Sequence, residues 1–151
     1  MKKKIVAGTL LLLVLVSAVG YFVGRGKEII NHNYVFVGAG EYWTAEYTVT
    51  AKEFFHEKNN RTEYSSNSTS EIKLIYSREL TELSELKEIS YSFKGNAGSE
   101  SGTEALTVPP KSKEVISRSS SGNGAFERKE SKIEVTVEWQ GKKETFYLTA
   151  K

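Results

Sequence analysis

The chain begins with a continuous apolar run and then changes to alternating apolar and polar positions. Residues 5–24 carry no charged side chain, and a helix of that length spans about 30 Å, the hydrocarbon thickness of a bilayer. Lys2, Lys3 and Lys4 precede the run and favour retention of the N-terminus in the cytoplasm. The pattern therefore predicts an N-terminal signal-anchor, transmembrane helix over residues 1–24, with the lipid bilayer as the partner of residues 5–24.

A cleaved signal peptide is the alternative interpretation of the same run. Ile5–Val16 would be its apolar region, and the small residues Ser17, Ala18 and Gly20 would suit a signal peptidase. The apolar stretch continues to Val23, which is longer than the ~7–15 residues typical of a signal peptide and favours the uncleaved anchor. We expect a single-pass cell-membrane protein with its C-terminal domain on the extracellular side, or a secreted protein after cleavage.

Residues 25–40 are expected to form a juxtamembrane linker. Tyr34–Val37 within it has the composition of a short strand, and the flexible segment Gly38–Gly40 follows. From Glu41 to Ala51 the apolar residues recur at every second position, which predicts a half-buried strand. The residues on its apolar face are Trp43, Ala45, Tyr47, Val49 and Ala51.

Further segments with strand-like patterns follow along the chain. They are 71–77, 89–93, 104–108 and 114–119. Glu57–Ser70 is polar and predicts a surface loop or a solvated hairpin, and Gly95–Gly98 and Gly122–Gly124 predict turns. Leucines at positions 80, 83 and 86 indicate either a short helical turn over one end of the sheets or a loop with buried leucines.

The C-terminal segment has the most specific pattern. Lys132–Trp139 and Lys142–Thr149 flank Gln140-Gly141, which suits a two-residue hairpin loop. Folding the chain at this point places Val135 opposite Phe146, Ile133 opposite Leu148, and Glu138 opposite Lys143. Apolar pattern, turn and charge thus predict one register.

About seven short strands separated by turns are typical of a β-sandwich. We expect an all-β fold, a small immunoglobulin-like β-sandwich over residues 41–151, behind the N-terminal transmembrane helix.

The composition excludes several classes of function. The chain has no cysteine, so it has no disulfide, no thiolate metal site, no cysteine nucleophile and no N-terminal lipid anchor on cysteine. Residues 41–151 carry 16 basic and 18 acidic side chains, and such a mildly acidic domain lacks the basic patch that nucleic acid requires. We expect no nucleic-acid partner.

Residues for catalysis are scarce. His32 and His56 have no nucleophile or orienting partner nearby in the sequence, and neither has the spacing of a metal site. The densest group of carboxylates is best explained as a solvated acidic face; it comprises Glu79, Glu82, Glu85 and Glu88. The sequence therefore predicts no catalytic residue, no metal site and no cofactor, and we expect no enzyme.

Aromatic residues provide the one candidate ligand site. Tyr42 and Trp43 are consecutive, so in a strand one of them faces outward, and Trp139 stands beside the hairpin turn. Exposed rings at these three positions would form a stacking platform for a glycan. The alternative, which such residues follow more often, is packing in the core or at its edge.

Three segments together resemble a group of uncharacterised proteins. Gly40–Trp43, Gly122–Ala125 and Ile133–Thr145 are similar to segments of extracytoplasmic proteins and lipoproteins of Gram-positive, bacillus-like bacteria. Members share a small C-terminal β-domain behind an export signal, and the likeness covers roughly residues 40–149. Many members carry a lipid-bearing cysteine that this chain lacks, which favours a helical anchor. The resemblance implies no activity and no site residue.

These observations lead to one expectation of function and two alternatives. We expect a noncatalytic, membrane-anchored, extracytoplasmic binding or structural module of the cell envelope, with an envelope protein or a wall polymer as its partner. The first alternative is a cell-wall glycan-binding or small glycan-processing domain. The second is an accessory or inhibitory subunit of a membrane complex.

Overall fold

The computed structural model of the chain describes residues 28–58 and 61–151. The predicted anchor over residues 5–24 lies outside the described residues. Within the described ranges, no helix has the length and hydrophobicity needed to cross a bilayer.

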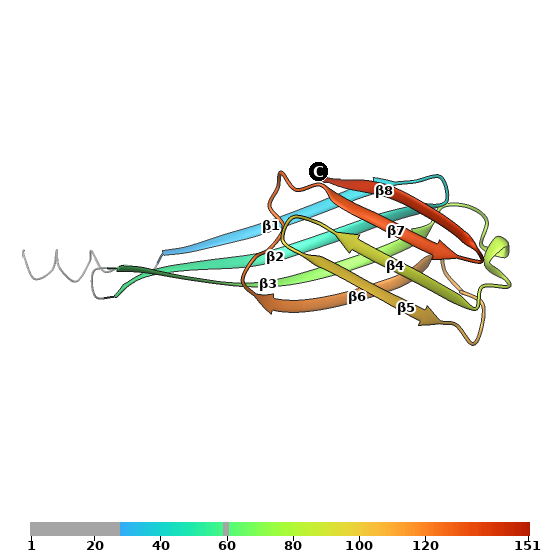
Figure 1. Cartoon of the computed structure of the whole chain (residues 1–151), viewed down its shortest axis with the longest axis horizontal. Helices are drawn as coiled ribbons and strands as arrows, with labels where there is room; N and C mark the ends of the chain where they lie inside the picture. The colour runs from blue at the N-terminus through green and yellow to red at the C-terminus, as the bar shows by residue number, and fades with distance from the viewer. Residues whose placement is uncertain (1–27, 59–60) are drawn as a thin grey trace, which may run out of the picture. The chain divides into compact units, whose positions relative to one another are not determined.

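The described residues form eight strands and one short 3₁₀ helix, which confirms the predicted all-β class. In chain order the elements are β1 (Glu28–Ala39), β2 (Trp43–Lys58), β3 (Arg61–Tyr76), η1 (Leu80–Leu83), β4 (Glu88–Lys94), β5 (Ser99–Ala105), β6 (Glu114–Asn123), β7 (Ile133–Trp139) and β8 (Lys142–Ala150). Figure 1 shows them with these labels.

The described residues fall into two compact units. The smaller unit contains residues 28–30, 53–58 and 61–65, and the larger one contains residues 31–52 and 66–151. Strands β1, β2 and β3 contribute residues to both units.

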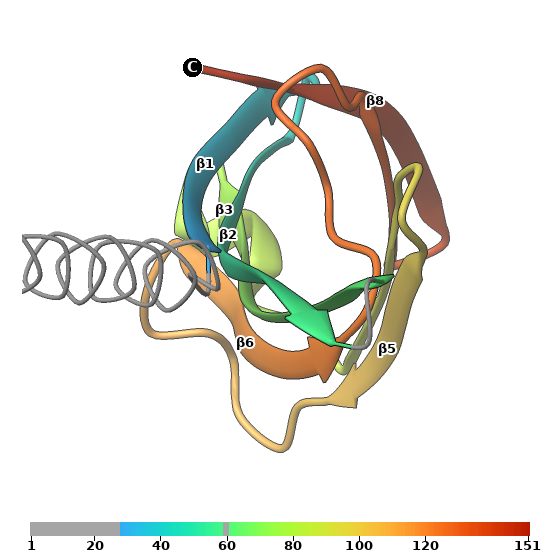
Figure 2. The ribbon, with the colours of Figure 1, turned by 90° about the vertical axis from the view of Figure 1, so that its left-hand side faces the viewer.

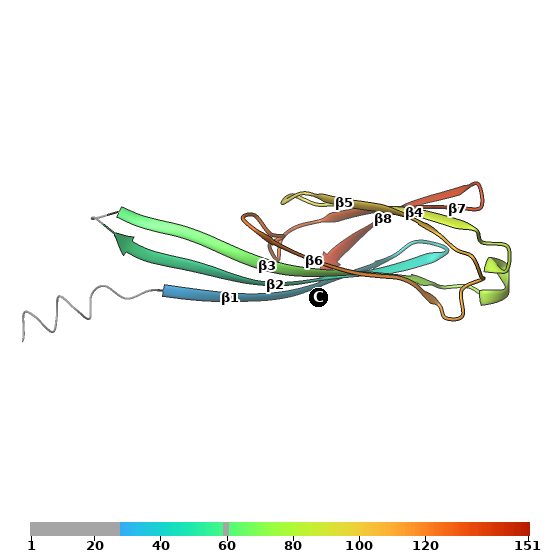
Figure 3. The ribbon, with the colours of Figure 1, turned by 90° about the horizontal axis from the view of Figure 1, so that it is seen from below.

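The strands follow one another in a single curled sheet with the order β5-β4-β7-β8-β1-β2-β3-β6. In the larger unit, the curl places β4, β5, β7 and β8 over β1, β2, β3 and β6, as the end-on and lower views show (Figures 2 and 3). The two halves are joined where β1 pairs with β8, with Phe36 opposite Ala150 and Val37 opposite Thr149. This arrangement has the two layers of a sandwich, but the immunoglobulin-like topology is not confirmed, because all eight strands belong to one sheet.

The core of the larger unit follows the predicted alternation. On β2, Trp43, Ala45, Val49 and Ala51 are buried and Tyr47 is half-buried against them. Leu83 in η1 and Leu86 just after it are also buried, so a short helical turn with buried leucines follows β3. Burial of this apolar surface is the main force that holds the two layers together.

The β7–β8 hairpin has the predicted register. Val135 lies opposite Phe146, Ile133 opposite Leu148, and Glu138 opposite Lys143. At the turn, Gln140 and Gly141 have φ angles of 47° and 74°. Positive φ at both central residues is typical of a type I′ turn, whose twist matches that of the flanking strands.

β2 and β3 extend beyond their predicted ranges through the hairpin of residues 51–58 and 61–71, and three further strands differ from the sequence prediction. β1 covers Glu28–Ala39 rather than only Tyr34–Val37, so most of the expected linker is strand. β6 extends beyond Ser119 to Asn123, and only Gly124, at φ +107°, leaves the extended conformation. The strand predicted over 104–108 was wrong, because the structure has β5 at Ser99–Ala105 instead.

The bounds of β5 and β6 were mispredicted for the same physical reason. Apart from buried Ile116, their inward positions are glutamate, glycine, arginine and serine, so the strands lack most of the apolar alternation from which strands are recognised.

In the smaller unit, the ends of β2 and β3 form the solvated hairpin that the polar composition of residues 57–70 allowed. Its side chains pair across the strands. The Tyr64 hydroxyl donates to Glu53 Oε1 at 2.8 Å, the Tyr64 and Phe55 rings lie 5.2 Å apart, and His56 lies 2.9 Å from Glu63. Glu53 is buried, and this hydroxyl satisfies one of its carboxyl oxygens.

A substitution in the hairpin turn tests its left-handed backbone. In full-length protein, Gly141→Ala should lower the free energy of unfolding by about 1–2 kcal/mol, because a Cβ is unfavourable at φ +74°. Gly98→Ala is the matched control, since a Cβ there meets no atom within 4 Å, and it should change the free energy of unfolding by less than about 1 kcal/mol. Denaturant titration of both variants measures the difference, and equal effects would contradict the assigned turn.

Candidate functional site

The three rings predicted as a stacking platform lie together in the larger unit. The ring of Trp139 lies 5.5 Å from that of Tyr42 and 5.6 Å from that of Trp43. Trp43 and Trp139 are buried, with 0% and 3% of their surface exposed, and only Tyr42 is partly open to solvent. Two of the three rings therefore pack in the core, as the alternative interpretation held, and they offer no face to a sugar.

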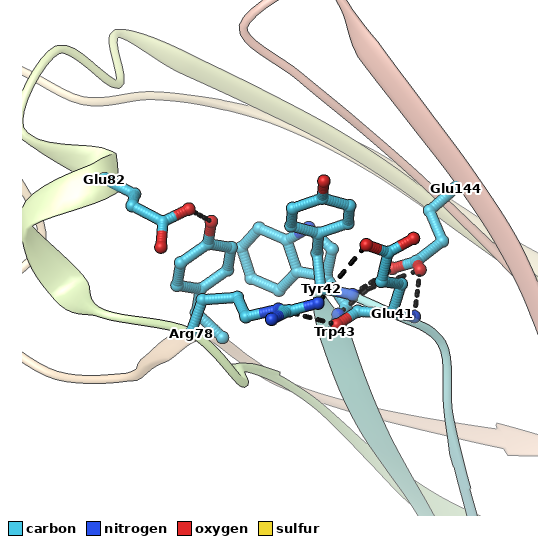
Figure 4. Close-up of polar contacts among 7 residues, drawn as sticks. Glu41, Tyr42, Trp43, Arg78, Glu82 and Glu144 are labelled. Atoms are coloured by element: carbon cyan, nitrogen blue, oxygen red, sulfur yellow. Dashed lines mark hydrogen bonds and ion pairs between the residues drawn. The ribbon is translucent and has the colours of Figure 1, made fainter.

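The exposed side of this cluster is charged. The Arg78 guanidinium lies 5.4 Å and the Lys142 ammonium 5.1 Å from the centre of the Tyr42 ring, so the one open ring already faces two cations. The Tyr76 ring lies 5.0 Å from that of Trp43, and its hydroxyl donates to Glu82 Oε2 at 2.9 Å, with Glu82 labelled in Figure 4. Burial of Tyr76, together with this bond to a carboxylate, raises the pKa of its phenol to about 12.

Glu144 on β8 holds the chain where β1 turns into β2. Its carboxylate accepts hydrogen bonds from three consecutive backbone N–H groups, those of Glu41, Tyr42 at 3.1 Å and Trp43 at 3.0 Å (Figure 4). A Cβ at Gly40 would overlap this carboxylate, which explains the glycine. The arrangement resembles an anion site in which the anion is the protein's own side chain.

A polar cavity of about 210 Å³ lies within the larger unit, between the two halves of the sheet. We call it the polar cavity. Its lining residues are Tyr47, Val49, Ser68, Ser70, Phe93, Gly95, Ala97, Gly98, Ser99, Glu100, Ser120, Ser121, Gly122, Ala125, Phe126, Glu127 and Ile133. They come from β2 to β6, from the β4–β5 turn, from the loop after β6 and from the start of β7.

The register of the strands explains why polar side chains point into this space. Phe93 faces the core, and Glu100 lies directly opposite it on β5. On the other half of the sheet, Ser70 lies opposite Ser120. Two positions further along β3, Ile72 is buried, and Arg118 lies opposite it on β6. Residues directly opposite one another share a face of the sheet, so glutamate, serine and arginine occupy positions that elsewhere hold apolar side chains.

Hydrogen bonds connect these side chains in a chain across four strands. The Tyr47 phenol on β2 bonds with Ser70 on β3, Ser70 lies 2.8 Å from Ser120 on β6, and Ser120 donates to Glu100 Oε2 on β5 at 3.4 Å. Burial raises the pKa of Tyr47, the hydrogen bond with Ser70 lowers it, and the nearby charges of Glu127 and Glu100 raise it further, so the net shift is upward. The wall of the cavity thus carries hydroxyl and carboxylate groups linked to one another.

Glu127 forms the other carboxylate of the cavity, and only 4% of its surface is exposed. Its two oxygens accept from the backbone N–H groups of Asn96 at 3.1 Å and Ala97 at 2.7 Å. A Cβ at Gly95 would overlap the Glu127 carboxylate. This residue therefore holds the β4–β5 turn in the way that Glu144 holds the β1–β2 connection, and the predicted turn at Gly95–Gly98 is confirmed.

Strands β5 and β6 are the two ends of the sheet, and only side chains join them. Arg118 on β6 forms an ion pair with Glu104 on β5, and Ser120 bonds with Glu100 as described above. The contact made by the later residue on β6, Ser120, is with the earlier residue on β5, Glu100. The two edge strands therefore run antiparallel. The polar cavity lies beside this junction, since both strands contribute to its lining.

The remaining polar residues singled out from the sequence lie elsewhere. His32 bonds with the Tyr34 hydroxyl and stacks at 5.1 Å on Phe126, whereas His56 pairs with Glu63 in the smaller unit. Glu79, Glu85 and Glu88 are solvent-exposed, and Glu82 is bonded to Tyr76. In the described part of the chain, no group of three or more His, Cys, Asp or Glu side chains is placed to share a metal ion.

Sequence reasoning missed the polar cavity. The signal for it is the serine-rich run from Ser117 to Ser121 in a segment that the register requires to face the core at every second residue. Without knowledge of the pairing partners, that run is indistinguishable from a solvated loop.

Fold and site together define a small all-β protein with a polar cavity beside the two unpaired edges of a curled sheet. No family model, no curated protein and no solved structure matches the chain.

The role of Glu144 is testable by removing its charge. Glu144→Gln should lower the free energy of unfolding by about 1–3 kcal/mol, because an amide offers one acceptor oxygen to three N–H donors. Glu138→Gln is the control, since its ion pair with Lys143 is exposed on both sides and contributes only about 0.2–1 kcal/mol. Equal losses in denaturant titrations of the two variants would contradict the structural role of Glu144.

The raised pKa of Tyr76 predicts a loss of stability at alkaline pH. The phenol ionises near pH 10 in the unfolded chain and near pH 12 in the folded one, so its contribution is complete below pH 10 and is lost as the pH rises through 12. Over that window the free energy of unfolding should fall by roughly 2–3 kcal/mol more in the wild type than in Tyr76→Phe. Tyr147→Phe removes an exposed tyrosine whose pKa is raised mainly by its bond to Glu134, and it should remove much less of this alkaline loss; a similar loss in Tyr76→Phe and the wild type would show that Tyr76 is not its source.

Proposed function

We propose that the chain is a noncatalytic binding module, held on the outer face of the cell membrane by residues 5–24, and that it binds its ligand in the polar cavity. The observation that carries this proposal is a group of inward-facing polar side chains, half-buried Ser70 and Glu100 and buried Glu127, at positions where apolar side chains would stabilise the fold more. Polar groups at such positions cost stability, so a ligand is the simplest reason for their presence.

The engagement of the carboxylates supports a noncatalytic role. Glu127 has both oxygens bonded to backbone N–H groups of the β4–β5 turn, so its role is structural rather than catalytic. Glu100 accepts from Ser120 and has no histidine beside it in the cavity lining. A general acid and base would need two carboxylates, or a histidine, free to exchange protons with a substrate.

The start of β1 supports attachment to a membrane. Glu28 follows the uncharged run by four residues, a length of chain that reaches at most about 14 Å. The smaller unit therefore begins close to the proposed bilayer surface. The smaller unit exposes Ile29, Ile30 and Tyr64. Apolar and tyrosine side chains are favourable at the interface between lipid and water.

The alternative of a glycan platform on Tyr42, Trp43 and Trp139 has less support. Trp43 and Trp139 are buried, and Tyr42 faces Arg78 and Lys142. A wall polymer or an envelope protein as the partner remains part of the proposal, with the polar cavity as the place of contact.

Single cysteines test the proposed topology, because the chain has none of its own. In intact cells, Ser119→Cys, on the exposed surface of β6, should react with a membrane-impermeant maleimide, whereas Lys3→Cys should react only after lysis. Lys3→Cys should also stay on the full-length chain, since an anchor is not cleaved. Protection of both cysteines in intact cells would contradict export, and loss of the N-terminal label during maturation would replace the anchor by a cleaved signal peptide.

A further inference from the structure

We infer that the ligand of the polar cavity carries an ammonium group on a compact, hydroxylated body, as an amino sugar does. This inference rests on the proposed binding function and names the chemical class of its ligand. Three properties of the cavity lead to it: its charge, its aromatic wall and its size.

The charge of the lining is negative. Glu100 and Glu127 are the ionisable acids of the lining, and no lysine, arginine or histidine is among the lining residues. Two guanidinium groups lie nearby: Arg118 is paired with Glu104, and Arg128 lies 4.0 Å from the centre of the lining ring of Phe126, so the rings of Tyr47 and Phe93 are the ones considered for a ligand. In a partly enclosed space of low effective dielectric constant, two carboxylates favour a cation and disfavour an anionic ligand.

Aromatic rings provide the second contact that suits an ammonium group. Tyr47, Phe93 and Phe126 line the cavity, and the Tyr47 and Phe93 rings lie 6.3 Å apart with 31° between their planes. The face of an aromatic ring attracts a cation within about 6 Å, and the same face packs against the C–H groups of a sugar ring. The rings thus favour an organic cation over a bare metal ion.

The size and the hydroxyl groups define the rest of the ligand. A cavity of about 210 Å³ is smaller than the roughly 300–1,000 Å³ of sites for drug-sized molecules, so it suits a single small ring. Ser68, Ser70 and Ser120 line the wall with groups that donate and accept hydrogen bonds. Such a wall matches a ligand that also carries hydroxyl groups.

The experiment compares two probes that differ in one group. Glucosamine and glucose are titrated into the purified full-length protein in detergent, at mildly acidic pH where the amine is protonated, and binding is measured by calorimetry. We expect glucosamine to bind at least tenfold more tightly than glucose. Equal affinities would overturn the ammonium inference while leaving the cavity as a binding site, so the two proposals fail separately.

Substitutions locate the binding. Glu100→Gln should weaken glucosamine binding at least tenfold and leave the weak binding of glucose nearly unchanged, because it removes the charge and keeps the shape. Glu85→Gln, at an exposed glutamate outside the cavity lining, is the matched control and should bind both probes as the wild type does. Thermal unfolding of each variant shows whether the fold is retained.

Other outcomes would contradict the inference. Binding of glucosamine that is equally weakened by Glu85→Gln would indicate nonspecific attraction to surface charge. Tighter binding of calcium than of glucosamine, lost in Glu100→Gln, would assign the cavity to a metal ion instead. Absence of binding of every probe would overturn the proposed ligand site itself, and the cysteine labelling of the membrane topology is independent of that result.

Discussion

The unpaired edges of β5 and β6 constrain the rest of this structure. A strand at the end of a sheet presents backbone N–H and C=O groups that have no partner within the sheet, and such groups are costly to bury in an apolar environment. The curl of the sheet brings these edges within side-chain reach, since Arg118 pairs with Glu104 and Ser120 bonds with Glu100. The edge groups need water or polar neighbours, and the polar cavity, whose polar side chains we assign to ligand binding, lies beside them.

Two glutamates then fix the connections around this open sheet. Glu144 binds three backbone N–H groups where β1 passes into β2, and Glu127 binds two in the turn between β4 and β5. In both places a glycine makes room for the carboxylate, Gly40 in one and Gly95 in the other. Glu127 has a further effect, because the turn that it holds is followed directly by β5 and so determines where Glu100 enters the polar cavity. The residue that stabilises the turn is thereby also the residue that positions the site.

The sequence predicts those parts of the fold whose determinants are local. The β7–β8 hairpin is specified by apolar alternation, by Gln140-Gly141 and by the Glu138–Lys143 pair, all within one short segment, and its register is confirmed. The apolar face of β2 and the leucine turn at η1 are local in the same sense.

The polar cavity is not local, because it depends on pairings between segments far apart in the chain, such as Ser70 with Ser120. The contact between Glu144 and the backbone of residues 41–43 joins positions about a hundred residues apart, and no composition signal marks it.

The aromatic candidates show the converse case. Their residue types suggested a platform, but whether Trp43 and Trp139 face solvent is decided by the layer packed over them, which the sequence does not display.

The position of the cavity also bears on where the acidic side chains of the domain lie. Residues 41–151 hold 18 acidic and 16 basic side chains, and the inward-facing group at the two edges holds three glutamates and one arginine, namely Glu100, Glu104, Glu127 and Arg118. Outside this group the two signs are equal in number, with 15 side chains of each. Part of the acidic excess therefore lies at and beside the polar cavity. A negative field focused in a partly enclosed cavity attracts small cations while the surface stays electrostatically balanced, so the same composition that argues against nucleic acid argues for a positively charged small ligand.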